Sequence, residues 1–122
     1  MPTMIHAEIY TGQTVIHDGF IRFEETIQEI GPMSAYTERD ETVIDLAGKR
    51  LIPGMIDVHI HGGYDVDMMD ASAEALYRLS EAMLAEGVTS FFATTITQDW
   101  HQITRALEVA RDVIDSRETT IE

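Results

Sequence analysis

A chain of 122 residues with 44% hydrophobic and 25% charged residues has the composition of a globular protein. Its 8 basic and 22 acidic residues give a formal net charge of −14, which argues against nucleic acid and membranes as partners. No cysteine is present, which excludes disulfides and cysteine-based zinc sites. We find no secretory signal and no apolar run of the roughly 18 residues that span a membrane, and we expect a cytoplasmic protein.

Residues 1–52 are expected to form a small all-β module. Apolar residues at positions 5, 7 and 9 alternate with polar neighbours, which is the pattern of a half-buried strand. The dipeptide Asp18-Gly19 predicts a hairpin turn, and Gly31-Pro32 predicts the end of a strand. Further short strands are expected at 15–16, 20–23, 26–30 and 42–46.

The pattern changes near residue 53. Residues 52–60 form a nearly continuous apolar run, which is typical of a parallel strand covered on both faces. Ser72 and Gly87 suit the start and the end of a helix whose apolar residues recur at helical spacing. Residues 88–96 are rich in β-branched and aromatic side chains and predict a second strand.

A second helix is predicted after this strand, because Asp99 followed by Gln102 resembles a capping box. Its apolar face is expected at Ile103, Leu107, Ala110 and Ile114. Two strands, each followed by a helix, are the repeating unit of an α/β fold. Two such units leave strand edges unpaired and apolar helix faces uncovered, so we expect a homo-oligomer.

The most informative motif is the histidine pair His59 and His61, at the end of the first of these two strands. Alternate residues of a strand share one face, which places the two Cβ atoms roughly 6–7 Å apart. Two imidazoles in this arrangement can bind one metal ion of the zinc type. A chance pair at a polar strand end is the alternative. Three features favour metal binding: a turn at Pro53-Gly54 just before the strand, Asp57 on the same face as the histidines, and Gly62-Gly63, which lets the backbone pass close to a ligand.

Other polar residues have weaker functional readings. Asp57 either orients a metal-binding histidine or satisfies backbone groups of the strand. Both are supporting roles, and we favour them over direct metal binding. Thr94, Thr95 and Thr97 either belong to a site or simply favour a strand, and we favour strand formation. Asp65, Asp67 and Asp70 either form a cation site or lie in a solvated loop, and we favour the loop. Solvated or structural roles are expected for the isolated histidines His6, His17 and His101.

The string Pro53–His61 resembles the amidohydrolase superfamily. Within that superfamily, the longer strings His61–Asp65, Met69–Ser72 and Glu86–Thr97 resemble the N-acetylglucosamine-6-phosphate deacetylase family. The resemblance implies an α/β fold with a partial β-sandwich domain over residues 1–52. It further implies that residues 53–122 are the first two β/α units of an incomplete (β/α)8 barrel of a metal-dependent hydrolase.

The resemblance also implies an activity, the hydrolysis of an N-acetyl amide to glucosamine 6-phosphate and acetate. It implies a divalent metal, Zn or Fe, with room for two ions in the complete enzyme, and it makes His59 and His61 metal ligands. The family's other ligands, a glutamate and two histidines, and its catalytic aspartate come from later strands. We therefore expect an N-terminal fragment that is inactive alone and holds no catalytic residue.

Two other functions stay open at this stage. One is a different amidohydrolase, related to dihydroorotases or hydantoinases, which act on cyclic amides. The other is a non-catalytic module that associates with itself through its uncovered strand edges. The expected small-molecule partner of the complete enzyme is an amino-sugar phosphate.

Overall fold

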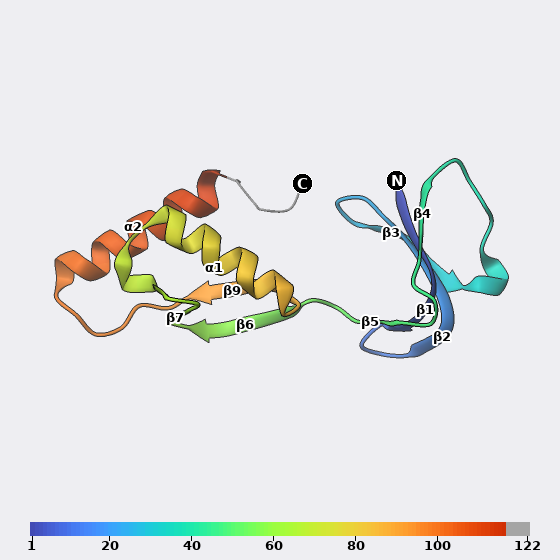
Figure 1. The fold of residues 1–122 in the computed structure, drawn as a ribbon, viewed down its shortest axis with the longest axis horizontal. Helices are drawn as coiled ribbons and strands as arrows, with labels where there is room; N and C mark the ends of the chain where they lie inside the picture. Colours follow the sequence, from blue (N-terminus) through green and yellow to red (C-terminus); the bar gives the residue numbers. More distant parts are fainter. Residues whose placement is uncertain (117–122) are drawn as a thin grey trace. The chain divides into compact units, whose positions relative to one another are not determined.

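The computed structural model describes residues 1–116. The chain divides into two compact units, Met1–Pro53 and Gly54–Glu122 (Figure 1). The first unit is built from strands and the second from strands and helices, so the chain has an α/β fold with mixed sheets.

The first unit is a five-stranded sheet in the order β3-β2-β1-β4, with β5 also paired to β1. Strand β1 lies antiparallel to β2 and parallel to β4 and β5. The bounds of the elements are β1 Pro2–Tyr10, β2 Val15–Phe23, β3 Ile27–Pro32, β4 Thr42–Asp45 and β5 Arg50–Leu51, with a short 3-10 helix at Met33–Ala35. Ala7 and Ile9 are buried, as their alternation with polar residues predicts, whereas Ile5 is only partly buried because the strand is irregular between Met4 and Ala7.

The predicted hairpin turn at Asp18-Gly19 is wrong, because both residues lie inside β2. The chain turns earlier, where the backbone N–H of Thr11 donates to the carbonyl oxygen of Thr14 over 3.0 Å. Gly19 is instead a point of close approach in the sheet. A Cβ atom there would lie 2.8 Å from Cδ1 of Ile9 and 2.9 Å from Cγ2 of Ile16, so a side chain at this position would force both isoleucines to move.

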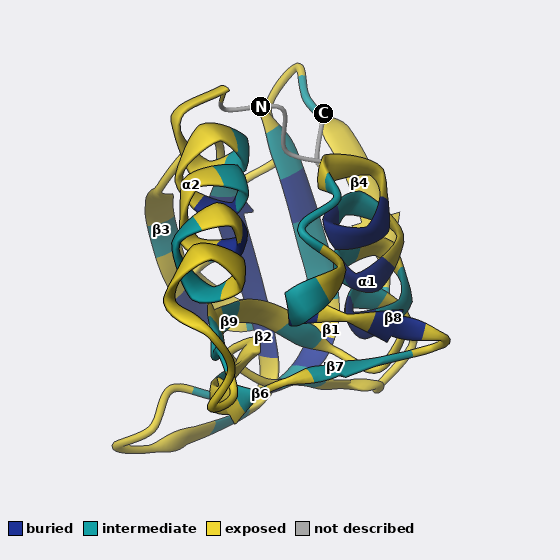
Figure 2. Cartoon of the chain, turned by 90° about the vertical axis from the view of Figure 1, so that its left-hand side faces the viewer, coloured by how far each residue is buried: buried dark blue, intermediate teal, exposed yellow. Residues whose placement is uncertain are grey.

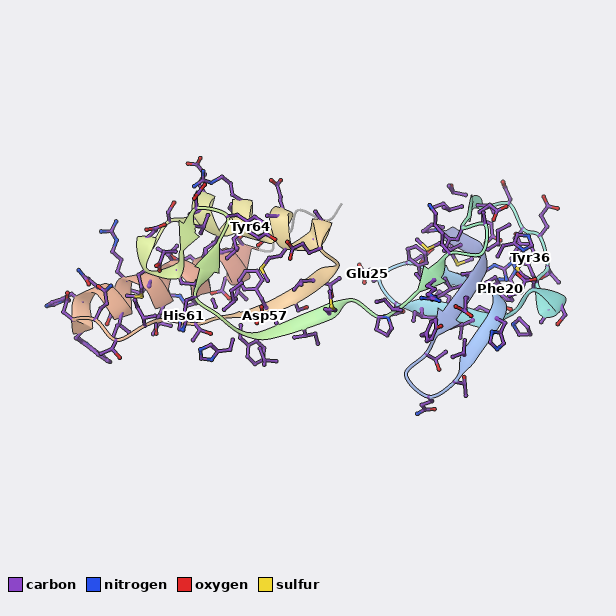
Figure 3. All side chains as sticks on the ribbon, turned by 60° about the horizontal axis from the view of Figure 1, so that its bottom comes forward. Phe20, Glu25, Tyr36, Asp57, His61 and Tyr64 are labelled. Atoms are coloured by element: carbon purple, nitrogen blue, oxygen red, sulfur yellow. The ribbon has the colours of Figure 1, made fainter. Side chains whose placement is uncertain are left out.

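A buried arginine holds the segment that connects β3 to β4. Arg22 is fully buried and donates to the carboxylate of Glu41, to Glu29 over 2.7 Å and to the carbonyl oxygen of Thr37. Its guanidinium lies 5.0 Å from the ring centre of Phe20 and 4.9 Å from that of Tyr36. The two aromatic side chains lie side by side on this unit (Figure 3).

The second unit has the predicted order of strand, helix, strand and helix. Strands β6 and β9 pair in parallel, and a small hairpin of β7 and β8 follows β6. The bounds are β6 Met55–Ile60, β7 Gly62–Gly63, β8 Val66–Asp67, a 3-10 helix at Met68–Asp70, α1 Ala73–Ala85, β9 Val88–Ala93 and α2 Trp100–Ser116. Strand β9 ends three residues before the predicted position.

The predicted helix ends are confirmed. The Ser72 hydroxyl accepts from the backbone N–H of Ala75 over 3.3 Å, and Gly87 follows α1 with a φ of +83°. The Asp99 carboxylate accepts from the backbone N–H of Gln102 over 3.1 Å at the start of α2. Among residues 1–116, neither helix is long and apolar enough to cross a membrane.

The core of this unit lies between the helices and one face of the two-stranded sheet (Figure 2). Its buried members are Val66, Met68, Ala75, Leu76, Leu79, Met83 and Ala110. On α2 the predicted apolar face is partly wrong, since Ala106 and Ala110 are buried while Leu107 and Ile114 are exposed. The helix is apolar on more than one side, and small alanines let it approach its neighbours most closely.

The expectation that β6 is covered on both faces is also wrong for the described residues. The residues Ile56 and Val58 are 62% and 66% exposed, and Phe92 in β9 is exposed as well. The helices of this unit pack against partly buried residues such as Ile60 and Phe91. Within residues 1–116 no further element of this unit covers the opposite face, which leaves an apolar surface in contact with solvent.

Candidate metal centre

The histidine pair lies at the carboxyl end of β6, with His59 inside the strand and His61 directly after it. Their Nε2 atoms are 3.2 Å apart. The ring centres are 4.9 Å apart, and the ring planes are perpendicular. The strand spacing predicted that both side chains point the same way, and the structure brings the two ring nitrogens together at one point.

The spacing of the two nitrogens suits a zinc-type ion. Two nitrogen ligands about 2.0–2.1 Å from a tetrahedral zinc are about 3.3 Å apart from each other. The 3.2 Å between the Nε2 atoms of His59 and His61 matches that geometry. Both side chains are exposed, so an ion can reach them. The two imidazoles therefore fit a divalent metal.

The next strand orients one of the two rings. Nδ1 of His61 lies 2.9 Å from the main-chain carbonyl oxygen of Thr94, just past the end of β9. Metal-binding imidazoles commonly donate their second ring N–H to a carbonyl or a carboxylate, which fixes the ring. The favoured assignment of Thr94, Thr95 and Thr97 to a strand is wrong, because β9 ends at Ala93. The contribution of Thr94 to the site is a main-chain atom.

The backbone of His61 is held by the hairpin that follows it. The backbone N–H of Met68 donates to the carbonyl oxygen of His61 over 2.8 Å. Gly62 has a φ of +149°, and a Cβ atom there would overlap with the carbonyl oxygen of Val66. The glycine is thus required by the tight turn after the histidine pair.

Asp57 supports the pair through the backbone. Its carboxylate accepts from the backbone N–H of His59 over 3.0 Å. The pairing register of β6 with β9 shifts between Asp57 and Ile60, so the strand is irregular where the histidines lie. This contact agrees with the supporting role that we favoured for Asp57 from the sequence.

The acidic residues after the pair are used by the backbone. The Asp67 carboxylate accepts from the N–H of Met69 over 2.8 Å, and the Asp70 carboxylate accepts from the N–H of Asp67 over 3.0 Å. These two bonds cap a short 3-10 helix. In residues 1–116 no group of three or more histidine, cysteine, aspartate or glutamate side chains is placed to hold a metal.

The remaining histidines do not join the pair. His6 and His17 belong to the first unit and contact the carboxylates of Asp18 and Glu8 over 3.1 and 3.3 Å. His101 is exposed near the start of α2, and its backbone N–H donates to the Asp99 carboxylate over 3.0 Å. The side chains of Thr95 and Thr97 make no recorded hydrogen bond within the described part of the chain.

A parallel pair of strands, with two convergent imidazoles where the first strand ends, defines an α/β protein with a candidate metal site. Comparison with known families gives the class a name. The chain belongs to the amidohydrolase family, whose model matches residues 50–117.

The relatives within this family are more specific. The chain is 38% identical over 117 residues to N-acetylglucosamine-6-phosphate deacetylase of Bacillus subtilis, which covers 93% of this chain and 29% of that protein. It is 34% identical over 122 residues to the Vibrio furnissii enzyme of the same name, which covers 94% and 31%.

A solved structure agrees with these relatives. The fold resembles the crystal structure of N-acetylglucosamine-6-phosphate deacetylase from Pasteurella multocida, with a TM-score of 0.87 and 27% identity. That match covers 98% of this chain and 32% of the other. The chain thus spans about a third of the length of the proteins it resembles.

Proposed function

We propose that His59 and His61 are two ligands of the divalent metal centre of an amidohydrolase. The observation that carries this proposal is the 3.2 Å separation of their Nε2 atoms at the end of a parallel strand. The proposed metal is Zn or Fe, with a second ion in the complete enzyme. The neutral imidazole donors suit either metal.

We propose N-acetylglucosamine 6-phosphate as the substrate of the complete enzyme, with glucosamine 6-phosphate and acetate as products. The names of the relatives in Bacillus subtilis and Vibrio furnissii support this substrate. They also favour an acyclic amide over the cyclic amides that dihydroorotases and hydantoinases hydrolyse. The cytoplasmic location and the absence of nucleic-acid and membrane partners stay predictions from composition.

The proposed architecture follows from the same relatives. Residues 1–52 are proposed as part of a β-sandwich, and residues 53–122 as the first two β/α units of a (β/α)8 barrel. The parallel pairing of β6 with β9 supports this, as do the exposed apolar side chains Ile56, Val58 and Phe92. In a closed barrel every strand has a neighbour on each side, helices cover the outer face of the strands, and apolar side chains fill the interior against the opposite face.

The chain's own residues have limited roles in this reaction. A bound divalent ion would polarise the amide carbonyl and activate water as the nucleophile. His59 and His61 would hold that ion, and Thr94 and Asp57 orient the two histidines. Catalytic zinc takes three protein ligands as a rule. Since the described residues place only two together, we propose that this chain alone does not turn over substrate.

Zinc titration of the 122-residue chain by calorimetry tests the metal site. We expect binding by the unaltered chain and a loss of binding in His59→Gln and in His61→Gln. His101→Gln is the matched control, because His101 is an exposed histidine of the same unit. Unchanged zinc binding in the chain that carries both His59→Gln and His61→Gln would contradict the proposal.

A substrate panel tests the reaction. The 122-residue chain is expected to release no acetate from N-acetylglucosamine 6-phosphate in the presence of zinc. A longer protein that contains this sequence is expected to do so and to leave dihydroorotate and hydantoins intact. Preference of that protein for a cyclic amide would replace the deacetylase by the second candidate.

We also propose that the 122-residue chain associates with itself, because an apolar strand face of this kind promotes association. The exposed Ile56 and Val58 carry the proposal. Light scattering over a range of concentrations is expected to show a mass above that of one chain, and Val58→Lys is expected to lower it. A monomer at every concentration would contradict the homo-oligomer.

A further inference from the structure

The two histidines of the pair differ in how their outer ring nitrogens are held. Nδ1 of His61 lies 2.9 Å from the carbonyl oxygen of Thr94. A carbonyl oxygen only accepts hydrogen bonds, so Nδ1 of a neutral His61 carries the proton and its Nε2 presents a lone pair. Within residues 1–116, Nδ1 of His59 has no recorded partner of this kind.

Thr94 is itself fixed between the two strands. Its backbone N–H donates to the carbonyl oxygen of Ile60 over 3.0 Å, which ties it to β6. Its hydroxyl donates to the carbonyl oxygen of Phe92 over 2.9 Å, which ties it to β9. With both bonds in place, the carbonyl group of Thr94 has a set direction, and that direction is toward the ring of His61.

We propose that Thr94 is a positioning residue that prepares His61 to bind metal through Nε2 before any ion arrives. The proposal rests on the metal centre proposed above, but it concerns a property of the metal-free chain. His59 is the adaptable partner. Its Nε2 lies 3.2 Å from Nε2 of His61 and must donate there when His61 presents its lone pair. The two histidines thus hold opposite tautomers without metal.

Preparation of one ligand raises the affinity of the site. An ion binds only the tautomer with a free Nε2, so the apparent affinity falls with the fraction of His61 in that form. Loss of the groups that orient metal-binding histidines costs about 10–100-fold in metal affinity. We expect an effect of that size when the carbonyl of Thr94 is no longer held in place.

Proton–nitrogen correlation spectra of the imidazoles test the assignment in the metal-free 122-residue chain. Under conditions in which both rings are neutral, the spectra show one tautomer or a mixture for each ring. We expect the proton on Nδ1 in His61 and on Nε2 in His59. A His61 ring with its proton mainly on Nε2 would overturn the proposal, whatever the zinc affinity of the chain.

Three variants test the role of Thr94. Thr94→Gly removes the hydroxyl bond and frees the backbone, and it is expected to give a mixture of His61 tautomers and about 10–100-fold weaker zinc binding. Thr94→Ser keeps the hydroxyl and is expected to match the unaltered chain in both. Thr95→Gly makes the same change one residue further along, where the side chain makes no hydrogen bond within residues 1–116. This control is expected to leave the His61 tautomer unchanged.

The outcomes separate the two proposals. An unchanged His61 tautomer in a folded Thr94→Gly chain would overturn the role of Thr94, even if zinc binds. The expected tautomers without zinc binding in any chain would support the role of Thr94 in the ring's orientation and overturn the metal centre. If Thr94→Gly does not fold, the unaltered chain is compared with Thr94→Ser instead. The same Nδ1–H form of His61 in both chains supports the proposal. A His61 tautomer that differs between them overturns it.

Discussion

Arg22 and Glu41 form an ion pair that is closed off from solvent, with side chains 0% and 1% exposed. Arg22 donates to both carboxylate oxygens of Glu41 over 3.0–3.1 Å. The pair joins the end of β2 to the end of the loop that precedes β4. Arg22 keeps a second carboxylate partner in Glu29, so the loss of Glu41 leaves the buried guanidinium only partly compensated.

Glu41→Gln is therefore expected to destabilise the first unit. The amide keeps the shape of the side chain and removes the buried one of the two carboxylates that compensate Arg22, the other being the partly exposed Glu29. We expect a lower Tm and faster hydrogen exchange in β1 and β2. Glu38→Gln is the matched control, because Glu38 is an exposed glutamate of the same loop without a recorded ion pair among residues 1–116. Equal exchange rates in the two variants would contradict the structural role of the pair.

The same pair predicts how stability depends on pH. Hydrogen bonds from Arg22 lower the pKa of Glu41 from 4.5 to about 2, although desolvation acts in the opposite direction. A folded pKa below the unfolded value means that the contribution is complete above pH 4.5 and disappears as the pH falls toward 2. We expect the stability of the first unit to decline across this window. In Glu41→Gln that decline is expected to be smaller, and an identical decline would contradict the assignment.

The core of the second unit predicts a contrast between two leucines. Leu79 in α1 is 0% exposed, whereas Leu107 in α2 is 50% exposed. Leu79→Ala is expected to cost about 2–5 kcal/mol, since it removes buried methyl groups and leaves a cavity. Leu107→Ala is expected to stay within about 0.5 kcal/mol. Urea unfolding followed by helical circular dichroism measures both, and similar midpoints would show that the core is misplaced.

The leucine contrast also marks what the sequence can predict. Helix ends at Ser72, Gly87 and Asp99 are local features, because a cap and the backbone groups it binds lie within one turn. The face of α2 is different, because its apolar residues occupy more than one side. Which side is buried depends on the neighbours that the rest of the fold supplies, and no spacing within the helix contains that information.

The histidine pair follows the same division. His59 and His61 are separated by one residue, so their shared direction follows from strand geometry. The group that orients His61 is the carbonyl oxygen of Thr94, 33 residues further along the chain. A main-chain oxygen has no residue-type signature, and only the pairing of β6 with β9 brings it to the ring. The ion pair of Arg22 with Glu41 could not be predicted from the sequence either, because only the fold brings together these two residues, 19 positions apart.

A further contrast concerns two serines near α1. The hydroxyl of Ser72 caps the helix, and Ser72→Ala is expected to cost about 1 kcal/mol. The hydroxyl of Ser80 donates to the carbonyl oxygen of Leu76 over 2.8 Å within the helix. Because alanine has the higher helix propensity, Ser80→Ala is expected to be neutral or slightly stabilising. Thermal unfolding of the two variants checks the order, and equal losses would argue against the cap.

The start of β6 lies against β9 at Gly54 and Thr89. A Cβ atom at Gly54 would overlap with both branches of the Thr89 side chain and would lie 2.7 Å from Cβ of Thr89. Gly54→Ala must therefore push the start of the strand away from its neighbour. Overpacking of this kind costs about 1–3 kcal/mol, and we expect a lower urea midpoint for the helical signal of the second unit.

Two further variants make the cause of that loss testable. Gly63→Ala is the matched control, because a Cβ atom there meets only Cδ1 of Leu79, at an ordinary contact distance of 3.9 Å. Thr89→Ala in the Gly54→Ala chain removes the two branches that overlap and is expected to restore part of the stability. If Thr89→Ala restores nothing, the contact between the two strands is not the reason for glycine at position 54, and the parallel pairing at this end of β6 is in doubt.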